Sequence, residues 1–154
     1  MILLDTNVIS EPLKSNGDPA VVAWIDAQVV ETLYLSTISV AELRYGIAAL
    51  PDGKRKDGLR ASMDERVLPL FRSRILSFDI EAAEACAVLR ARARAAGKGM
   101  GTADSYIAAI ATAKGLTVAT RDTQPFKAAG VQVINPWDSG QARSRQLTSR
   151  SESG

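Results

Sequence analysis

The chain opens with an apolar run that ends abruptly at an acidic residue. Residues 2–4 are Ile-Leu-Leu, and Asp5, Thr6 and Asn7 follow them directly. An uninterrupted apolar run predicts a strand buried on both faces, and such strands occur in parallel sheets that helices cover on both sides. The polar residues that follow favour a turn. The opening therefore favours an α/β fold with a carboxylate at the carboxyl end of its first strand.

Short apolar segments alternate with helical patterns along the rest of the chain. Further strands are predicted over four segments, at residues 32–35, 75–78, 116–119 and 131–134. Five helices are predicted between them. The first covers residues 19–27 with Asp18 as the N-cap, the second is opened by Ser39, and the third follows a polar connection and contains Met63, Val67 and Leu68. The last two cover residues 80–96 and residues 103–114, and Gly115 ends the latter. Elements this short cannot bury their own apolar faces, which predicts a mostly parallel sheet between two layers of helices.

Two residue counts narrow the chemistry that such a fold could support. The chain has no histidine, and Cys86 is its one cysteine. These counts exclude a Ser-His-Asp triad, a Cys-His pair, a His-ligated zinc, a disulfide and a thiolate metal cage. Hydrolytic chemistry would have to use carboxylates, hydroxyls, Lys or Arg, and carboxylates without histidine favour hard cations such as Mg²⁺ or Mn²⁺.

The length and composition fit one folded domain. The 154 residues are enough for one core, which we expect over residues 1–138. Residues 139–154 are rich in Ser, Gln, Arg and Gly and lack apolar periodicity, so we expect a disordered tail. This tail carries the whole net charge of +2, which weakens any argument for nucleic-acid binding from bulk charge. No export signal or membrane span is predicted, and we expect a cytoplasmic protein.

Four acidic residues are expected at one edge of the predicted sheet. Asp5 follows the first strand, Asp122 follows the fourth, and Glu42 and Asp104 lie in the first turns of two predicted helices. Each acid alone has a structural explanation: a turn for Asp5 and Asp122, a capping box with Ser39 for Glu42, and the helix dipole for Asp104. Parallel α/β sheets bind ligands at the carboxyl ends of their strands. Four acids gathered there would repel one another unless a divalent cation neutralised them.

The segments around these acids form a combined pattern. They read LLDTNV at residues 3–8, SVAELRYG at 39–46, ADSYIAA at 103–109 and ATRD at 119–122, the last followed by Phe126. Together and in this order, over residues 1–137, they resemble the PIN domain. The similarity is greatest to toxin nucleases of the VapC type, including the FitB-like branch.

This resemblance implies a PIN-like three-layer α/β/α fold and a Mg²⁺- or Mn²⁺-dependent endoribonuclease that cleaves RNA with a metal-activated water. It implies that four residues are catalytic, namely Asp5, Glu42, Asp104 and Asp122, and that three of them, Asp5, Asp104 and Asp122, bind the metal. Supporting roles for Thr6, Asn7 and Thr120 follow from the same resemblance. Pro125 stands where many relatives have an acid.

The resemblance also implies partners for the chain. They are an RNA substrate, a cognate antitoxin of a type II toxin–antitoxin pair, a second copy in a homodimer, and operator DNA reached only through the antitoxin. Arg44 and Arg121 are candidates for steering RNA towards the acids, whereas Arg90, Arg92 and Arg94 are more simply explained as a solvated helix face.

Three other functions compete with the nuclease. A receiver domain needs a pair of acids after its first strand, and a haloacid-type phosphatase needs Asp-x-Asp, where this chain has Asn7. Both are disfavoured. The alternative that stays open is a binding module on a PIN scaffold, acting mainly with an antitoxin in an operator-binding complex and with weak or no nuclease activity.

Overall fold

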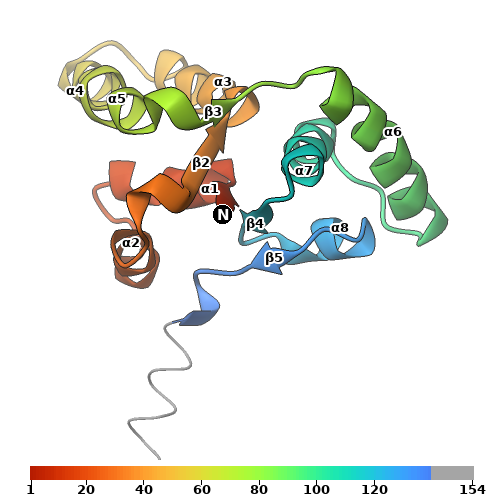
Figure 1. Ribbon diagram of the computed structural model, residues 1–154. Coiled ribbons are helices and arrows are strands. Elements are labelled where there is room, and N and C mark those ends of the chain that lie inside the picture. The colour runs from red at the N-terminus through yellow and green to blue at the C-terminus, as the bar shows by residue number, and fades with distance from the viewer. Residues whose placement is uncertain (140–154) are drawn as a thin grey trace, which may run out of the picture.

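A five-stranded parallel sheet forms the centre of the computed structural model, which describes residues 1–139 (Figure 1). In spatial order its strands are β3 (Ile75–Leu76), β2 (Leu33–Ser36), β1 (Ile2–Leu4), β4 (Thr117–Ala119) and β5 (Val133–Ile134). Every neighbouring pair runs parallel. The predicted α/β class and parallel sheet are therefore confirmed. The predicted tail lies, after Ser139, outside the described residues.

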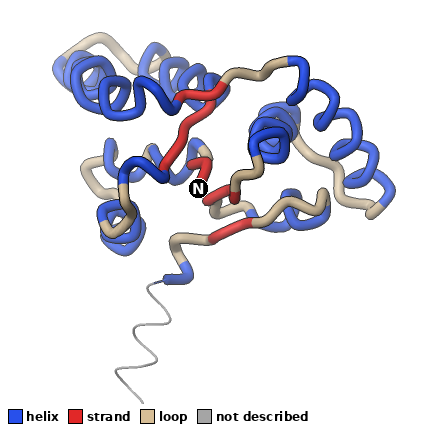
Figure 2. The backbone as a smooth tube through the Cα atoms, viewed as in Figure 1, coloured by secondary structure: helices blue, strands red, loops and turns tan. Residues whose placement is uncertain are grey.

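Helices cover both faces of this sheet, as Figure 2 shows. On one face lie α1 (Thr6–Ile9), α2 (Pro19–Asp26), α3 (Thr37–Ala48), α4 (Lys54–Ser62), a π-helical turn (Met63–Val67) and α5 (Leu68–Phe71). On the other lie α6 (Ile80–Ala95), α7 (Thr102–Lys114) and α8 (Thr123–Ala128), with α6 packed on α7. The three-layer arrangement is the predicted one. No helix within residues 1–139 is long and apolar enough to cross a membrane.

The opening apolar run supplies one buried residue to each face of the sheet. Leu3 belongs to the core under α6 and α7, whereas Leu4 belongs to the core under α1, α3 and α5. Both side chains are fully buried. The neighbouring strand repeats the pattern in register, because Val118 pairs with Leu3 and Ala119 with Leu4. Burial on both faces is the reason that this strand is apolar without alternation.

Helix ends agree with the predictions in most places. The Asp18 carboxylate accepts the Ala20 amide at 2.9 Å and caps α2, as predicted. Gly115 ends α7 in the left-handed conformation, with φ of 67°, which glycine adopts without steric cost. The short helices α1 and α8 were not predicted, because four to six residues carry too little periodicity to be recognised.

The predicted start of α3 was wrong. Ser36, not Ser39, is the N-cap, because its hydroxyl accepts the Ser39 amide at 3.1 Å and the helix begins at Thr37. Glu42 therefore lies in the second turn and forms no capping box. Strand β2 leads into the helix with no intervening loop, so the cap is also the last residue of the strand.

Candidate functional site

The parallel sheet brings the four predicted acids to one edge. Asp5 follows β1 immediately, and Asp122 lies three residues after the end of β4. Helix α7 leads into β4 and runs opposite to it, so its first turn, which holds Asp104, returns to the same edge. Glu42 reaches this edge from the second turn of α3, which starts where β2 ends. We call these four residues the acidic cluster.

Asp5 is the buried centre of this cluster. Its exposed fraction is 3 %, and both carboxylate oxygens accept a hydrogen bond. Oδ1 accepts the backbone amide of Thr6 at 2.8 Å, and Oδ2 accepts the buried hydroxyl of Thr120, also at 2.8 Å. The backbone amide of Asp5 also donates to the Ala119 carbonyl at 2.9 Å. Main chain and side chain are thus fixed together, and the carboxylate has one orientation.

Thr120 connects this carboxylate to the loop that carries Asp122. Its hydroxyl oxygen accepts the backbone amide of Asp122 at 3.1 Å, and the Asn7 side-chain amide lies 3.5 Å away. Asn7 in turn accepts the Arg121 backbone amide at 3.3 Å. The two predicted supporting residues, Asn7 and Thr120, therefore hold the β4 loop against Asp5.

Thr6, the third predicted supporting residue, connects α1 to α3. Its hydroxyl lies 2.9 Å from Oε1 of Glu42 and 3.0 Å from the Ser39 hydroxyl. Glu42 is exposed, and among the described residues the Thr6 hydroxyl is the one hydrogen-bond partner that orients its side chain. Ser39, predicted as a helix cap, instead presents its buried hydroxyl to the site. Ser39 is the third residue of α3. A correct prediction of the helix start would have shown that Ser39 lies inside the helix, where it cannot serve as the cap.

The pKa values show that the acids interact. Burial raises the pKa of Asp5 from 3.8 to about 6, the hydrogen bonds from Thr120 and Thr6 oppose this rise, and the charges of Asp104 and Glu42 add to it. Asp104 is half-buried, and burial first, then the charges of Asp122 and Glu42, raises its pKa as well. Asp104 therefore lies within electrostatic reach of the other three predicted acids.

The donor set suits a hard cation that keeps most of its water. Within residues 1–139, no three acidic or cysteine side chains lie close enough to form a complete metal cage. The acidic cluster offers only oxygen ligands, and burial first, then the charges of neighbouring acids, raises the pKa values of Asp5 and Asp104. Mg²⁺ is commonly held by one or two carboxylates and several waters, so the residues present fit such an ion.

The two arginines predicted to steer RNA have different surroundings. The Arg44 guanidinium forms an ion pair with Asp64 and is thereby held at the surface of α3. Arg121 is exposed, and its guanidinium carbon lies 5.1 Å from the centre of the Trp137 ring. Arg121 also directly precedes Asp122. Of the two, Arg121 is the one next to the acidic cluster, and among the described residues it forms no salt bridge.

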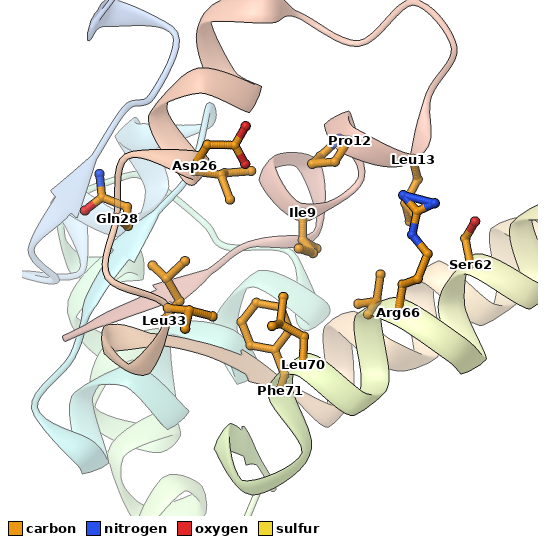
Figure 3. A pocket seen from close by; sticks show the side chains of 13 residues that line it. Ile9, Pro12, Leu13, Asp26, Gln28, Leu33, Ser62, Arg66, Leu70 and Phe71 are labelled. Atoms are coloured by element: carbon orange, nitrogen blue, oxygen red, sulfur yellow. The ribbon is translucent and has the colours of Figure 1, made fainter.

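An apolar hollow lies elsewhere in the molecule, and its lining differs from the acidic edge of the sheet. It has a volume of about 430 Å³, and Figure 3 shows side chains of α1, α2, β2 and α5 around it, among them Ile9, Leu33 and Phe71. Its lining is mostly apolar, with Asp26 and Arg66 as its charged residues. It includes no member of the acidic cluster, so it takes no part in the chemistry of those acids.

Comparisons with known proteins agree with this geometry. The family model of the PIN domain matches residues 2–131, and the chain belongs to this family. It is 61 % identical to the plasmid stability protein StbB of Pseudomonas syringae over 138 aligned residues. These residues cover 90 % of this chain and 99 % of StbB. With the same coverage it is 56 % identical to the VapC ribonuclease Y4jK of Sinorhizobium fredii.

Two further matches concern Fit proteins, the first of them toxin FitB of Neisseria gonorrhoeae. Toxin FitB is 53 % identical over 137 residues, covering 89 % of this chain and 99 % of FitB. The solved structure of FitAB bound to an IR36 DNA fragment matches with a TM-score of 0.86 and 52 % identity, over 89 % of this chain and 96 % of that one. The predicted resemblance to VapC-type and FitB-like toxins is thus confirmed, and the matches support a nuclease toxin.

Proposed function

We propose that this chain is a Mg²⁺- or Mn²⁺-dependent endoribonuclease and the toxin of a type II toxin–antitoxin pair. The observation that supports it most is the convergence of four acids around the buried, doubly hydrogen-bonded carboxylate of Asp5. A relative named as a ribonuclease and another named as a toxin support the same activity. In this proposal Asp5, Glu42, Asp104 and Asp122 carry the reaction, and Asp5, Asp104 and Asp122 hold the metal.

Each acid would have a distinct part in this chemistry. Thr120 and the Thr6 amide keep Asp5 in one orientation, so that its free lone pairs point to one place at the edge of the sheet. Asp104 and Asp122 extend the same negative surface towards solvent. When bound, the divalent cation would lower the pKa of a water and offset charge on the phosphate. Without a cation the acids would repel an RNA phosphate.

Glu42 is the acid best placed to accept a proton. It is exposed, and the Thr6 hydroxyl orients one of its carboxylate oxygens without burying it. The chain contains no histidine, and a carboxylate is one of the groups that can take the proton from the attacking water. We therefore assign proton acceptance to Glu42 and cation binding to the other three acids.

The expected partners belong to the same proposal. FitAB has been solved bound to a DNA fragment, and on this likeness we propose that the present chain forms a homodimer and pairs with an antitoxin that brings it to operator DNA. The same complex favours the alternative, a binding module with weak or no nuclease activity. The two differ in whether the purified chain cleaves RNA.

A cleavage assay separates them. The full chain is incubated with transfer, ribosomal and messenger RNA, with Mg²⁺ and with chelator, beside the Asp104→Asn variant. Asp57→Asn is the matched control, because Asp57 is an exposed acid of α4 outside the acidic cluster. We expect cleavage by the wild type and Asp57→Asn only, and only with metal. No cleavage of any RNA, or equal cleavage by Asp104→Asn, would reject the nuclease.

A further inference from the structure

A polar hollow adjoins the acidic cluster on the side of Arg121. It has a volume of about 390 Å³, within the range of small-ligand sites, and it is open to solvent. The loop between α1 and α2 forms one wall through Lys14, Asn16 and Gly17, and Arg121 and Trp137 form the other. Cation binding and proton transfer at the acidic cluster make no use of this hollow.

Hydrogen bonds connect this hollow to the centre of the site. Arg121 lies between Thr120, which bonds Asp5, and Asp122, a member of the acidic cluster. Its backbone amide is held by the side chain of Asn7. A polymer whose phosphate lies at the acidic cluster would therefore extend past Arg121 into the hollow after a short distance along its chain.

The loop wall is built around a buried acid. Glu11 is 6 % exposed, with Oε1 accepting Lys14 Nζ at 2.8 Å and Oε2 accepting the Asp18 amide at 2.7 Å. Burial opposes the ionised form, but these two bonds and the charge of Arg121 hold the pKa of Glu11 below its usual value. A Cβ on Gly17 would lie 2.2 Å from the Glu11 carbonyl oxygen, so only glycine fits there. This wall therefore has a fixed shape.

The charges around the hollow are balanced. Two cations, Lys14 and Arg121, face two acids, Glu11 and Asp18, and both acids are engaged in hydrogen bonds within the chain. A balanced lining gives little attraction for a bare phosphate. The flat groups are more informative: the Trp137 ring carries the Arg121 guanidinium 5.1 Å from its centre. Aromatic rings and guanidinium planes are the surfaces on which proteins stack unpaired bases.

We propose that this hollow is a nucleobase subsite, which takes the base of an unpaired nucleotide next to the RNA bond that the acidic cluster cleaves. The base packs against Arg121 and Trp137, and the side-chain amide of Asn16 provides a hydrogen-bond donor and acceptor for its edge. The subsite rests on the proposed nuclease function and adds to it the place where a base beside the cleaved bond is held.

A fluorescence titration tests the subsite without cleavage. The chain has two tryptophans, so Trp24→Phe leaves Trp137 as the single reporter, and Asp104→Asn prevents cleavage. A short single-stranded RNA is added to the full-length double variant in Mg²⁺, beside the same RNA with abasic sugars. We expect the RNA that carries bases to quench Trp137 emission, and the abasic RNA to leave it unchanged. Equal quenching by the two RNAs would show that the protein recognises phosphate, and would overturn the proposal. Unchanged Trp137 emission would overturn it as well, and is the result expected if a protein partner fills the hollow.

A kinetic comparison separates this subsite from the nuclease itself. In an otherwise wild-type chain, Arg121→Ala and Asn16→Ala should raise KM for a single-stranded RNA, by about tenfold for Arg121→Ala, with kcat little changed. Arg90→Ala, an exposed arginine on α6, is the matched control and should leave KM unchanged. If the wild type cleaves RNA and Arg121→Ala retains its KM, the subsite fails and the nuclease stands. If the wild type cleaves no RNA, the nuclease fails, and the titration still decides whether the hollow binds bases.

Discussion

The centre and the rim of the acidic cluster differ in how firmly they are held. Asp5 is almost fully buried, both of its oxygens are hydrogen-bonded, and its pKa is raised to about 6. The rim consists of Glu42 and Asp122, which are exposed, and within residues 1–139 the Thr6 hydroxyl is the one side-chain group hydrogen-bonded to Glu42. The centre therefore defines where a cation would lie, whereas the rim can adjust to a substrate.

This difference has an energetic consequence. A pKa raised from 3.8 to about 6 means that the ionised form of Asp5 disfavours the folded state by about 3 kcal/mol near neutral pH. A bound divalent cation would remove most of this cost. At the centre, therefore, the folded chain bears an energetic cost for a charge that a cation would offset.

The largest contrast is expected in catalysis. Asp5→Asn should lower kcat/KM for RNA cleavage by about 10³-fold or more, because it removes the fixed carboxylate at the centre. Asp122→Asn should cost about 10- to 100-fold, as expected for an exposed acid at the rim. Single-turnover cleavage in Mg²⁺ measures both. Equal losses would remove the distinction between centre and rim.

The next contrast is in stability against pH, measured without metal. Because the pKa of Asp5 is higher in the folded state, the folded protein binds more protons than the unfolded chain between pH 4 and 6. The contribution of Asp5 is therefore most favourable below pH 4 and is lost as the pH rises through 6, by about 3 kcal/mol in total.

Urea unfolding between pH 4 and 7.5 tests this dependence. Asp5→Asn cannot ionise, so its stability should fall less over the same range and exceed that of the wild type at pH 7. Identical pH profiles for the two proteins would show that Asp5 ionises without cost.

A smaller effect is expected when the centre loses one of its hydrogen bonds. Thr120→Val keeps the shape of the side chain but leaves Oδ2 of Asp5 without a donor, which should cost about 1–2 kcal/mol of stability. In the wild type the Thr120 hydroxyl stabilises the ionised carboxylate of Asp5, so its loss should raise the pKa of Asp5 further. The acidic limb of the pH–rate profile should then move to higher pH. Thr117→Val, in the strand β4 that precedes Thr120 and outside the site, is the control and should do neither.

The smallest effect is expected at Arg44. Its guanidinium is paired with Asp64 at the surface, so Arg44→Gln should change kcat/KM less than about threefold. A loss comparable to that of Asp122→Asn would show that Arg44 leaves its ion pair to contact RNA, and would make the rim larger than the acids alone.

Much of this arrangement could be predicted from the sequence. The run at residues 2–4 correctly indicated a strand buried on both faces, because a strand in the middle of a covered sheet tolerates no polar alternation. Once the sheet was parallel, Asp5 and Asp122 had to meet at its carboxyl edge. Asp104 was placed correctly in the first turn of α7.

The remaining features depend on contacts between distant segments, which local patterns do not record. The capping box of Ser39 and Glu42 satisfied a local rule, but Ser36 competes for the same amide and the Thr6 hydroxyl of α1 binds Glu42 instead. The buried acid Glu11 was not singled out either, because its partner Asp18 is recruited only when the loop after α1 folds back. The different burial of Asp5 and Glu42 likewise required the folded chain.

Thermal unfolding with added Mn²⁺ or Mg²⁺ tests most directly whether the acids act together on one cation. We expect a saturable rise in Tm of about 5 °C for the wild type at metal concentrations well above Kd, because the ion binds only the folded acidic cluster. The Asp5→Asn/Asp104→Asn double variant should show no such rise. An equal rise in both proteins, or none in the wild type, would show that these four acids do not form a cation site.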